Sequence, residues 1–231
     1  MATQIKINPI IKTLLLSDIF FYIGWGLVQP LMALFIIKNI QNGDAVSVGW
    51  STAIYWLTFS VLRVPFGLFL DNKEGEKDDY FFLTFGLLLA ALVAFGFIFA
   101  NRIWHLYLLQ FFHGLGMAMS LAGWSAIFQR HLDPKLESTE FGISSSSVAL
   151  VTALSAVLGG WILEKTGSFV SVFAVVGLFG MAGVAVLLLI ANEFKGDFRP
   201  EQYLLLLFKR ETWQKFLEKS SLIREKVDHM S

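Results

Sequence analysis

The segment TLLLSDIFFYIGWGLVQPLMALFII, residues 13–37, is apolar over nearly its whole length, and Asp18 is its single charged residue. A helix needs about 20 predominantly apolar residues to cross the hydrocarbon core of a bilayer, so this run is long enough. Five similar runs follow it along the chain. Together the six runs cover residues 9–37, 47–70, 80–100, 103–128, 141–163 and 168–191. We therefore predict a domain of six transmembrane helices within residues 1–191.

The composition favours the same fold class. Of 231 residues, 55% are hydrophobic and only 16% are charged, and the mean hydropathy is +0.63. A soluble domain this apolar would aggregate, so we predict an all-α membrane protein with the lipid bilayer as its first partner. Strands of a membrane barrel would alternate apolar and polar residues, and these runs do not. The formal net charge of zero gives no indication of a nucleic-acid partner.

Lysine and arginine residues predict the orientation. With the N-terminus in the cytoplasm, 14 of them lie on the inner side and three, Lys38, Arg102 and Lys165, on the outer side. Cytoplasmic loops carry the excess of positive charge, so we expect both termini in the cytoplasm and the protein in the cell membrane. Residues 192–231 are predicted to form a cytoplasmic amphipathic tail that lies in the membrane interface. The alternative for this segment is a frayed, solvated tail.

Two opposite charges are predicted at similar depth in neighbouring spans. At 1.5 Å per residue, Asp18 lies roughly 13 Å and Arg63 about 12 Å from the inner ends of their spans. Charges at such depth are costly and usually functional. Asp18 and Arg63 would form a switchable pair, or one of them would bind a substrate or a proton. Alternatively, they form a static salt bridge, or Arg63 extends to the inner headgroups.

Polar and aromatic residues recur on one face of the first and of the fourth span. Asp18, Tyr22 and Gln29 share one helical stripe, and Gln110, His113 and Trp124 share another. His113 either relays protons or donates a hydrogen bond to a neighbouring helix. No second histidine or carboxylate lies at ligand spacing in its stripe, so neither a metal site nor a cofactor is expected. The predicted pathway for a substrate or ion contains Asp18, Tyr22, Gln29, Arg63, Gln110, His113 and Trp124.

The polar content of the spans follows a pattern of polar, polar and apolar that occurs twice. Spans three and six carry few polar residues, whereas spans one, two, four and five carry many. A repeat of three spans, in which the third faces lipid, would produce this order.

The loop after the second span carries the most specific local motif. Gly67 is followed by Asp71 after three residues and by the turn residue Gly75. Asp71 is expected to accept hydrogen bonds from a neighbouring helix or to pair with Arg130. Gly67, Asp71, Gly75 and Arg130 are thus the candidate residues of an inner gate.

In this motif, and in its order relative to residues 110–116 and Gly159-Gly160, the chain resembles the major facilitator superfamily of secondary transporters. One departure is Asn72, which stands where the family usually has Arg or Lys. The resemblance implies that the first, second, fourth and fifth helices surround a cavity and that the third and sixth face outward. Full-length members have two such halves, so a homodimer, or a heterodimer with another half, is expected; a gene fragment is the alternative.

The resemblance therefore implies a transporter that moves a small solute by alternating access, working as a dimer of six-helix halves. A second function class fits the same sequence: a non-transporting membrane interaction subunit whose cytoplasmic tail binds a partner. An enzyme is not expected, because the chain has no cysteine, no metal motif and no clear acid–base pair beyond Asp18 and His113.

Overall fold

The computed structural model describes residues 7–72 and 75–194. The predicted amphipathic tail therefore lies outside the described residues, apart from its first three positions. Within the described ranges every regular element is helical. Six helices are long and apolar enough to cross a membrane, which confirms the predicted all-α fold class.

The six spans are built as follows. The first comprises α1 (Pro9–Val28), the 3₁₀ turn η1 (Gln29–Leu31) and α2 (Met32–Asn39). The others are α3 (Ala45–Asp71), α4 (Lys77–Ile98), α5 (Ile103–His131), α6 (Glu137–Thr166) and α7 (Phe169–Leu187), which η2 (Leu188–Ile190) extends.

Several helices extend beyond their apolar runs, and their terminal residues explain why. The helix α6 begins at Glu137, four residues before the predicted run, because acidic side chains in a first turn are stabilised by the helix dipole. At the start of α3, Asp44 accepts hydrogen bonds from both the backbone and the hydroxyl of Ser47. The hydroxyl bond and then the backbone bond hold the pKa of the Asp44 carboxyl below its usual value.

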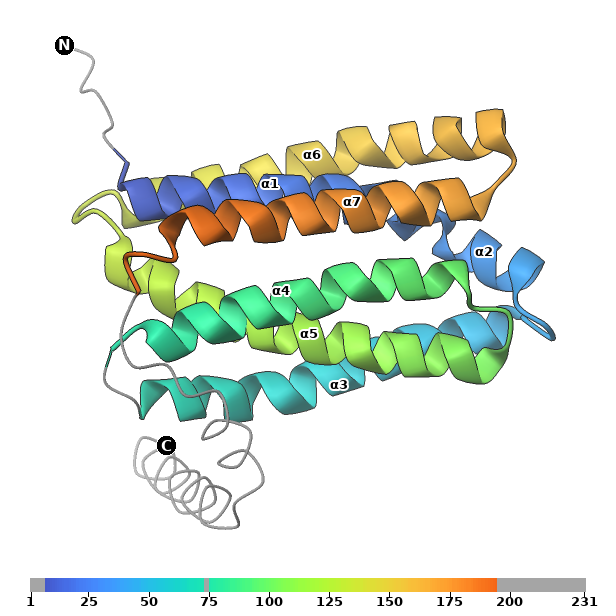
Figure 1. Ribbon diagram of the computed structural model, residues 1–231, viewed down its shortest axis with the longest axis horizontal. Coiled ribbons are helices and arrows are strands. Elements are labelled where there is room, and N and C mark those ends of the chain that lie inside the picture. The colour runs from blue at the N-terminus through green and yellow to red at the C-terminus, as the bar shows by residue number, and fades with distance from the viewer. Residues whose placement is uncertain (1–6, 73–74, 195–231) are drawn as a thin grey trace, which may run out of the picture.

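The helices form two groups of three, shown in Figure 1. In one group α1 contacts α6 and α7, and in the other α5 contacts α3 and α4; the α4–α7 contact joins the groups. Exchanging the first three spans with the last three converts each of these contacts into another contact of the same set. The fold thus has the symmetry expected of the three-span repeat.

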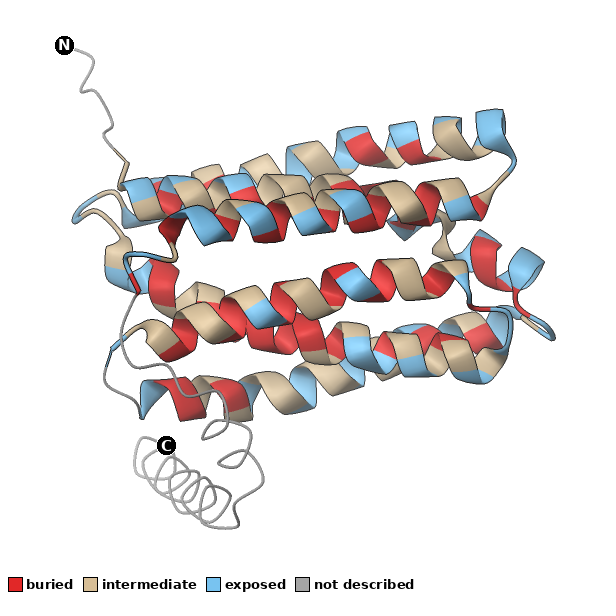
Figure 2. Cartoon of the chain, viewed as in Figure 1, coloured by how far each residue is buried: buried red, intermediate tan, exposed pale blue. Residues whose placement is uncertain are grey.

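Burial sets apart one helix of each group. The spans α3 and α6 are the least buried of the six, and exposed apolar positions such as Leu57 and Val157 recur along them (Figure 2). The predicted outward spans, α4 and α7, do expose apolar side chains, including Leu92 and Leu178. They are nevertheless about half buried, because they also pack against each other and against α5 and α1.

Small residues lie at the helix crossings. A Cβ atom at Gly159 of α6 would meet the backbone carbonyl of Leu27 on α1, and one at Gly114 of α5 would meet that of Tyr55 on α3. In lipid, helices associate through such close van der Waals contact and through hydrogen bonds. The Ser17 hydroxyl supplies one of these bonds, donating to the Gly183 carbonyl over 2.9 Å between α1 and α7.

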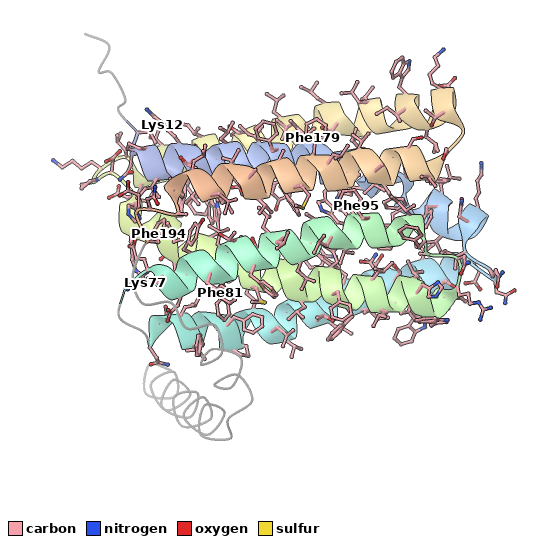
Figure 3. All side chains as sticks on the ribbon, in the orientation of Figure 1. Lys12, Lys77, Phe81, Phe95, Phe179 and Phe194 are labelled. Atoms are coloured by element: carbon pink, nitrogen blue, oxygen red, sulfur yellow. The ribbon has the colours of Figure 1, made fainter. Side chains whose placement is uncertain are left out.

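Side chains mark the two ends of the bundle. Lys12 and Lys77 lie at the same end, which we call the Pro9 end, whereas Phe179 lies midway along α7 and Phe95 lies in the last turn of α4 (Figure 3). Lys38 ends α2 and Gly167 ends α6 at the opposite end, the Gly167 end. Gly167 has a φ of +63°, a left-handed conformation in which glycine is not strained.

Two adjacent glycines test the importance of close packing. Gly159→Ala is expected to destabilise the protein by about 1–3 kcal/mol, because the new methyl group forces α6 away from Leu27. Gly160→Ala is the matched control, since a Cβ there meets nothing within 4 Å. In a helix this control replacement should be neutral or slightly stabilising. The measurement is the thermal unfolding midpoint of the detergent-solubilised protein, and equal midpoints for the two variants would contradict the contact.

Candidate functional site

A cavity of about 370 Å³ lies between α1, α3 and α5. It is lined by four of the predicted pathway residues: Tyr22, Gln29, Gln110 and His113. Gln29 reaches it from η1, where Pro30 interrupts the first span because proline lacks the N–H that an α-helix needs. The remaining wall is mainly aromatic and apolar, with Trp25, Tyr55 and Trp56 as its largest side chains.

His113 is held between two aromatic rings from two other helices. Its ring stacks on Trp25 of α1, with centroids 3.8 Å apart and an angle of 11° between the planes. Tyr55 of α3 covers it at 4.7 Å. These contacts join α1, α3 and α5 at one point of the cavity wall. Of the two roles considered for His113, the hydrogen bond to a neighbouring helix is replaced here by ring stacking.

Gln110 has a structural contact in this conformation. Its Nε2 donates to the hydroxyl of Ser51 over 3.0 Å, and both side chains are buried. The bond connects α5 to α3 near the N-terminal end of α3. Gln110 therefore lines the cavity while one of its amide N–H groups is already bonded to Ser51.

Asp18 and Arg63 do not form an ion pair in the described structure. The Arg63 guanidinium donates to the Ser125 hydroxyl over 3.5 Å and lies 5.4 Å from the centre of the Phe59 ring. Tyr22 is near enough to both charges for an electrostatic interaction with each. The static salt bridge is thus not present, and each charge is left to a separate set of neighbours.

Asp18 lies beside Trp124, the last of the predicted pathway residues. The indole Nε1 of Trp124 is buried and falls short of hydrogen-bond geometry with the carboxylate. Its ring stacks on Phe128 with centroids 4.4 Å apart, and Phe141 meets it edge-on. Asp18, Arg63 and Trp124 therefore lie outside the cavity wall, toward the Pro9 end, with Tyr22 as the link.

The candidate gate residues are arranged differently from the prediction. Arg130 forms an ion pair with Asp79 at the start of α4, and not with Asp71. Asp71 ends α3 with an exposed side chain and has no ion pair among the described residues. The predicted Asp71–Arg130 contact is therefore wrong for this conformation, because Asp79 is the carboxylate that the α4–α5 packing brings to Arg130.

The two glycines of the same motif have different outcomes. Gly75 has a φ of +98°, which suits the predicted turn. A Cβ atom at Gly67 would meet nothing within 4 Å, so Gly67 makes no close approach here. Packing within the described part of the chain therefore does not require a glycine at this position, and the gate role of Gly67 stays a prediction.

Sequence reasoning missed three partners that organise this region. Asp79 pairs with Arg130. Ser51 accepts a hydrogen bond from Gln110, and Ser125 accepts one from Arg63. A signal for Asp79 was present, since it directly precedes one apolar run and Arg130 closely follows the next. The two serines carried no such signal, because serine is common in membrane spans.

The side chains of the cavity are suited to binding a molecule more than to catalysing a reaction. Among residues 7–72 and 75–194, no three His, Asp or Glu side chains gather in a way that could hold a metal ion. The cavity offers aromatic faces, the amide of Gln29 and the hydroxyl of Thr52. Such walls hold an organic molecule through ring contacts and a few oriented hydrogen bonds.

Comparison with known proteins adds one positive finding. The family model described as Major Facilitator Superfamily matches residues 14–224 of the chain. No curated protein matches.

The ion pair of Arg130 gives a stability prediction. Arg130→Gln leaves the Asp79 carboxylate, which is 1% exposed, without its partner. Because Arg130 is itself 37% exposed, we expect a loss of about 1–3 kcal/mol, below the cost for a fully buried pair. The double variant Asp79→Asn, Arg130→Gln should recover part of that loss.

Arg102→Gln is the control for this prediction, since Arg102 is exposed and has no ion pair among the described residues. Unfolding free energies from denaturant titration in detergent give the comparison. If Arg130→Gln and Arg102→Gln behave alike, the ion pair does not stabilise the fold.

Proposed function

The chain belongs to the Major Facilitator Superfamily, and from this we propose that it is a secondary transporter that moves a small organic solute by alternating access. The observation that carries the proposal is the cavity between α1, α3 and α5. It gathers Tyr22, Gln29, Gln110 and His113 within an otherwise apolar bundle. Polar groups in a membrane span are costly and are retained where they bind something.

The proposed binding mode follows from the cavity wall. A solute with a flat or weakly polar face packs against Trp25, Tyr55 and Trp56, and its polar edge reaches Gln29 and Thr52. Aromatic side chains supply such contacts with little loss of conformational entropy, because they have few rotatable bonds. His113 keeps Trp25 in place through stacking.

Asp18 is the proposed coupling residue, with Arg63 as its partner in another conformation. Both charges lie near Tyr22, which faces the cavity, and neither is neutralised by the other in the described state. A charge without an ion partner at bilayer depth favours rearrangement when a proton or solute arrives. Asp71, exposed at the end of α3, is proposed to contact the second half at the inner gate.

A second six-helix half is proposed to cover the cavity. The family's halves are parallel repeats about an axis along the membrane normal, and a second copy of this chain would satisfy that arrangement. Of the two least buried spans, α3 lines the cavity and α6 packs against α1, which also lines it, and both supply exposed apolar positions for the contact. We propose a homodimer with α3 and α6 at its interface, in the cell membrane with both termini in the cytoplasm.

Transport is tested with a solute that is first found by its effect on the thermal unfolding midpoint of the purified protein. Trp25→Ala should reduce uptake of that solute into proteoliposomes about tenfold, since it removes a cavity wall and the partner of His113. Trp104→Ala is the control, because Trp104 is exposed and lies outside the cavity. Unchanged uptake by Trp25→Ala would refute this cavity as the binding site.

Deleting residues 197–231 distinguishes a transporter from the second function class, a non-transporting interaction subunit whose tail binds a partner. A transporter keeps most of its uptake after this deletion, whereas an interaction subunit loses its partner and has no uptake to lose.

The homodimer is tested by thiol crosslinking in intact membranes, which is direct because the chain has no native cysteine. Leu57→Cys on α3 and Val157→Cys on α6 should each give crosslinked dimers. Leu178→Cys on α7 is equally exposed and should not. Crosslinking through Leu178→Cys alone would place the interface on α7 and contradict an interface on α3 and α6. If none of the variants gives a dimer, the homodimer is refuted.

A further inference from the structure

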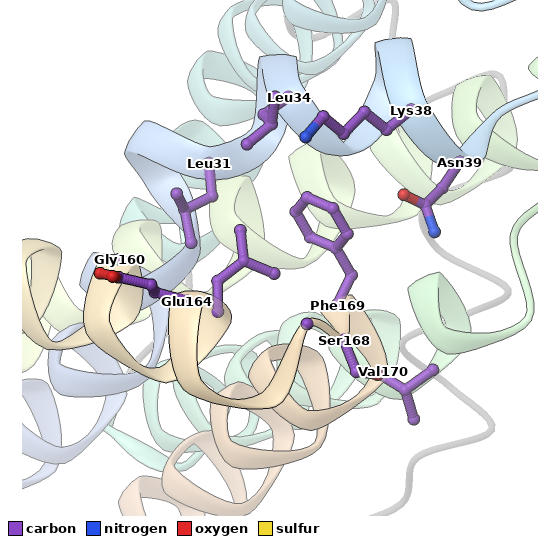
Figure 4. A pocket seen from close by; sticks show the side chains of 11 residues that line it. Leu31, Leu34, Lys38, Asn39, Gly160, Glu164, Ser168, Phe169 and Val170 are labelled. Atoms are coloured by element: carbon purple, nitrogen blue, oxygen red, sulfur yellow. The ribbon is translucent and has the colours of Figure 1, made fainter.

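A second hollow lies at the Gly167 end of the bundle, separate from the cavity. It has a volume of about 570 Å³ and is lined by residues of α2, α6 and α7, together with Leu31 of η1 (Figure 4). Its lower wall is apolar, with Leu31, Leu34 and Leu163, and Phe169 stands at the start of α7. We call it the outer-end groove.

The rim of the outer-end groove carries one charge of each sign. Lys38 from the end of α2 directs its ammonium group over the groove, while Glu164 lies on the α6 side (Figure 4). Neither belongs to an ion pair in the described part of the chain. The groove therefore presents a cation on its α2 wall and an anion on its α6 wall.

Three tryptophans fix the depth of the groove relative to the bilayer. Trp161, one turn before Glu164, is 58% exposed, and Trp50 and Trp104 are exposed at the same end of the bundle. Exposed tryptophans of membrane proteins gather at the level of the lipid headgroups. The charged rim of the groove therefore lies at headgroup level, and its leucine wall lies at the level of the acyl chains.

We propose that the outer-end groove binds a zwitterionic glycerophospholipid from the leaflet at this end of the bundle. Lys38 contacts the phosphate and Glu164 contacts the ammonium group. The upper part of an acyl chain packs on Leu31, Leu34 and Leu163. The amphipathic order of the groove, charged at the rim and apolar below, matches the order of groups along such a lipid.

Charge complementarity selects this lipid class over an anionic one. A phosphatidylethanolamine headgroup offers an anion to Lys38 and a hydrogen-bonding cation to Glu164. Phosphatidylglycerol has the same phosphate but no cation, so it leaves Glu164 facing a net negative lipid. A basic side chain near the membrane surface contributes about 1 kcal/mol toward an anionic group, which corresponds to about fivefold in affinity.

The groove shares α6 with the surface proposed for a second half of the transporter, but its other walls belong to α2 and α7. One of its walls is the start of α7, from Ser168 to Val170. A protein in the groove would have to bring fixed charges to both Lys38 and Glu164 and desolvate all four groups, which is costly. A lipid brings both charges on one flexible headgroup that is already in the bilayer.

Native mass spectrometry of the full chain, released from detergent with added dioleoyl lipids, tests the site. The wild-type protein should retain phosphatidylethanolamine about fivefold more than phosphatidylglycerol at equal concentration. Glu164→Gln should abolish this preference, and Lys38→Gln should weaken binding of both lipids about fivefold. Lys165→Gln, next to the groove but not lining it, is the control and should leave the preference unchanged.

Equal retention of the two lipids by the wild-type protein overturns the proposal, as does a preference that survives Glu164→Gln. A loss of preference in Lys165→Gln as large as in Glu164→Gln also overturns it, because it would reflect general surface charge. Val170→Cys tests the remaining occupant: if it crosslinks two copies of the chain, a protein and not a lipid fills the groove. Lipid retention is measured without uptake, so this experiment tests the lipid site independently of the proposed transport.

Discussion

Backbone-to-backbone contact at glycine is the constraint on which the rest of this structure depends. Lipid tails are as apolar as leucine, so helices in a bilayer are held by close packing and hydrogen bonds more than by the hydrophobic effect. At Gly159 and Gly114 the helices α6 and α3 approach the two central helices so closely that a methyl group would collide. These two contacts, α1–α6 and α5–α3, exchange with each other under the internal repeat. They fix how α1 and α5 are rotated, and therefore which side chains reach the cavity.

The ionisable side chains inside the bundle contact hydroxyl groups and aromatic rings. Arg63 is neutralised by no carboxylate in the described structure and rests on a hydroxyl and an aromatic ring. His113 is enclosed by rings and not by charges. The wall of the cavity consequently carries no Asp, Glu, Lys or Arg side chain. The hollow offers aromatic faces and amide groups, while Asp18 and Arg63 lie outside its wall, both near Tyr22.

The sequence was sufficient to predict the fold class, and its six apolar runs match the six long helices to within a few residues. It was also sufficient to place Tyr22, Gln29, Gln110 and His113 on stripes of their helices, because a helical period fixes which residues share a face. Helical periodicity does not say which neighbour each face meets. For that reason the stacking of Trp25 on His113 and the bond from Gln110 to Ser51 were not foreseen.

Contacts at the ends of the spans were harder to predict from the sequence for a related reason. Arg130 had several carboxylates within reach in sequence terms, and spacing alone did not distinguish Asp71 from Asp79. The choice is made by α4 packing along α5, which carries Asp79 to Arg130 and leaves Asp71 at the free end of α3.

The interruption at Pro30 has a consequence for the two hollows. Gln29 and Met32 line the cavity, whereas Leu31 and Leu34, which alternate with them along the same short segment, line the groove at the Gly167 end. The segment is held to α1 through a single tight turn, while α1 itself is anchored along α6 and α7. The two hollows thus share a partition. Any tilt of α2 that widens one compartment narrows the other, so their occupants would sense each other mechanically without ever touching.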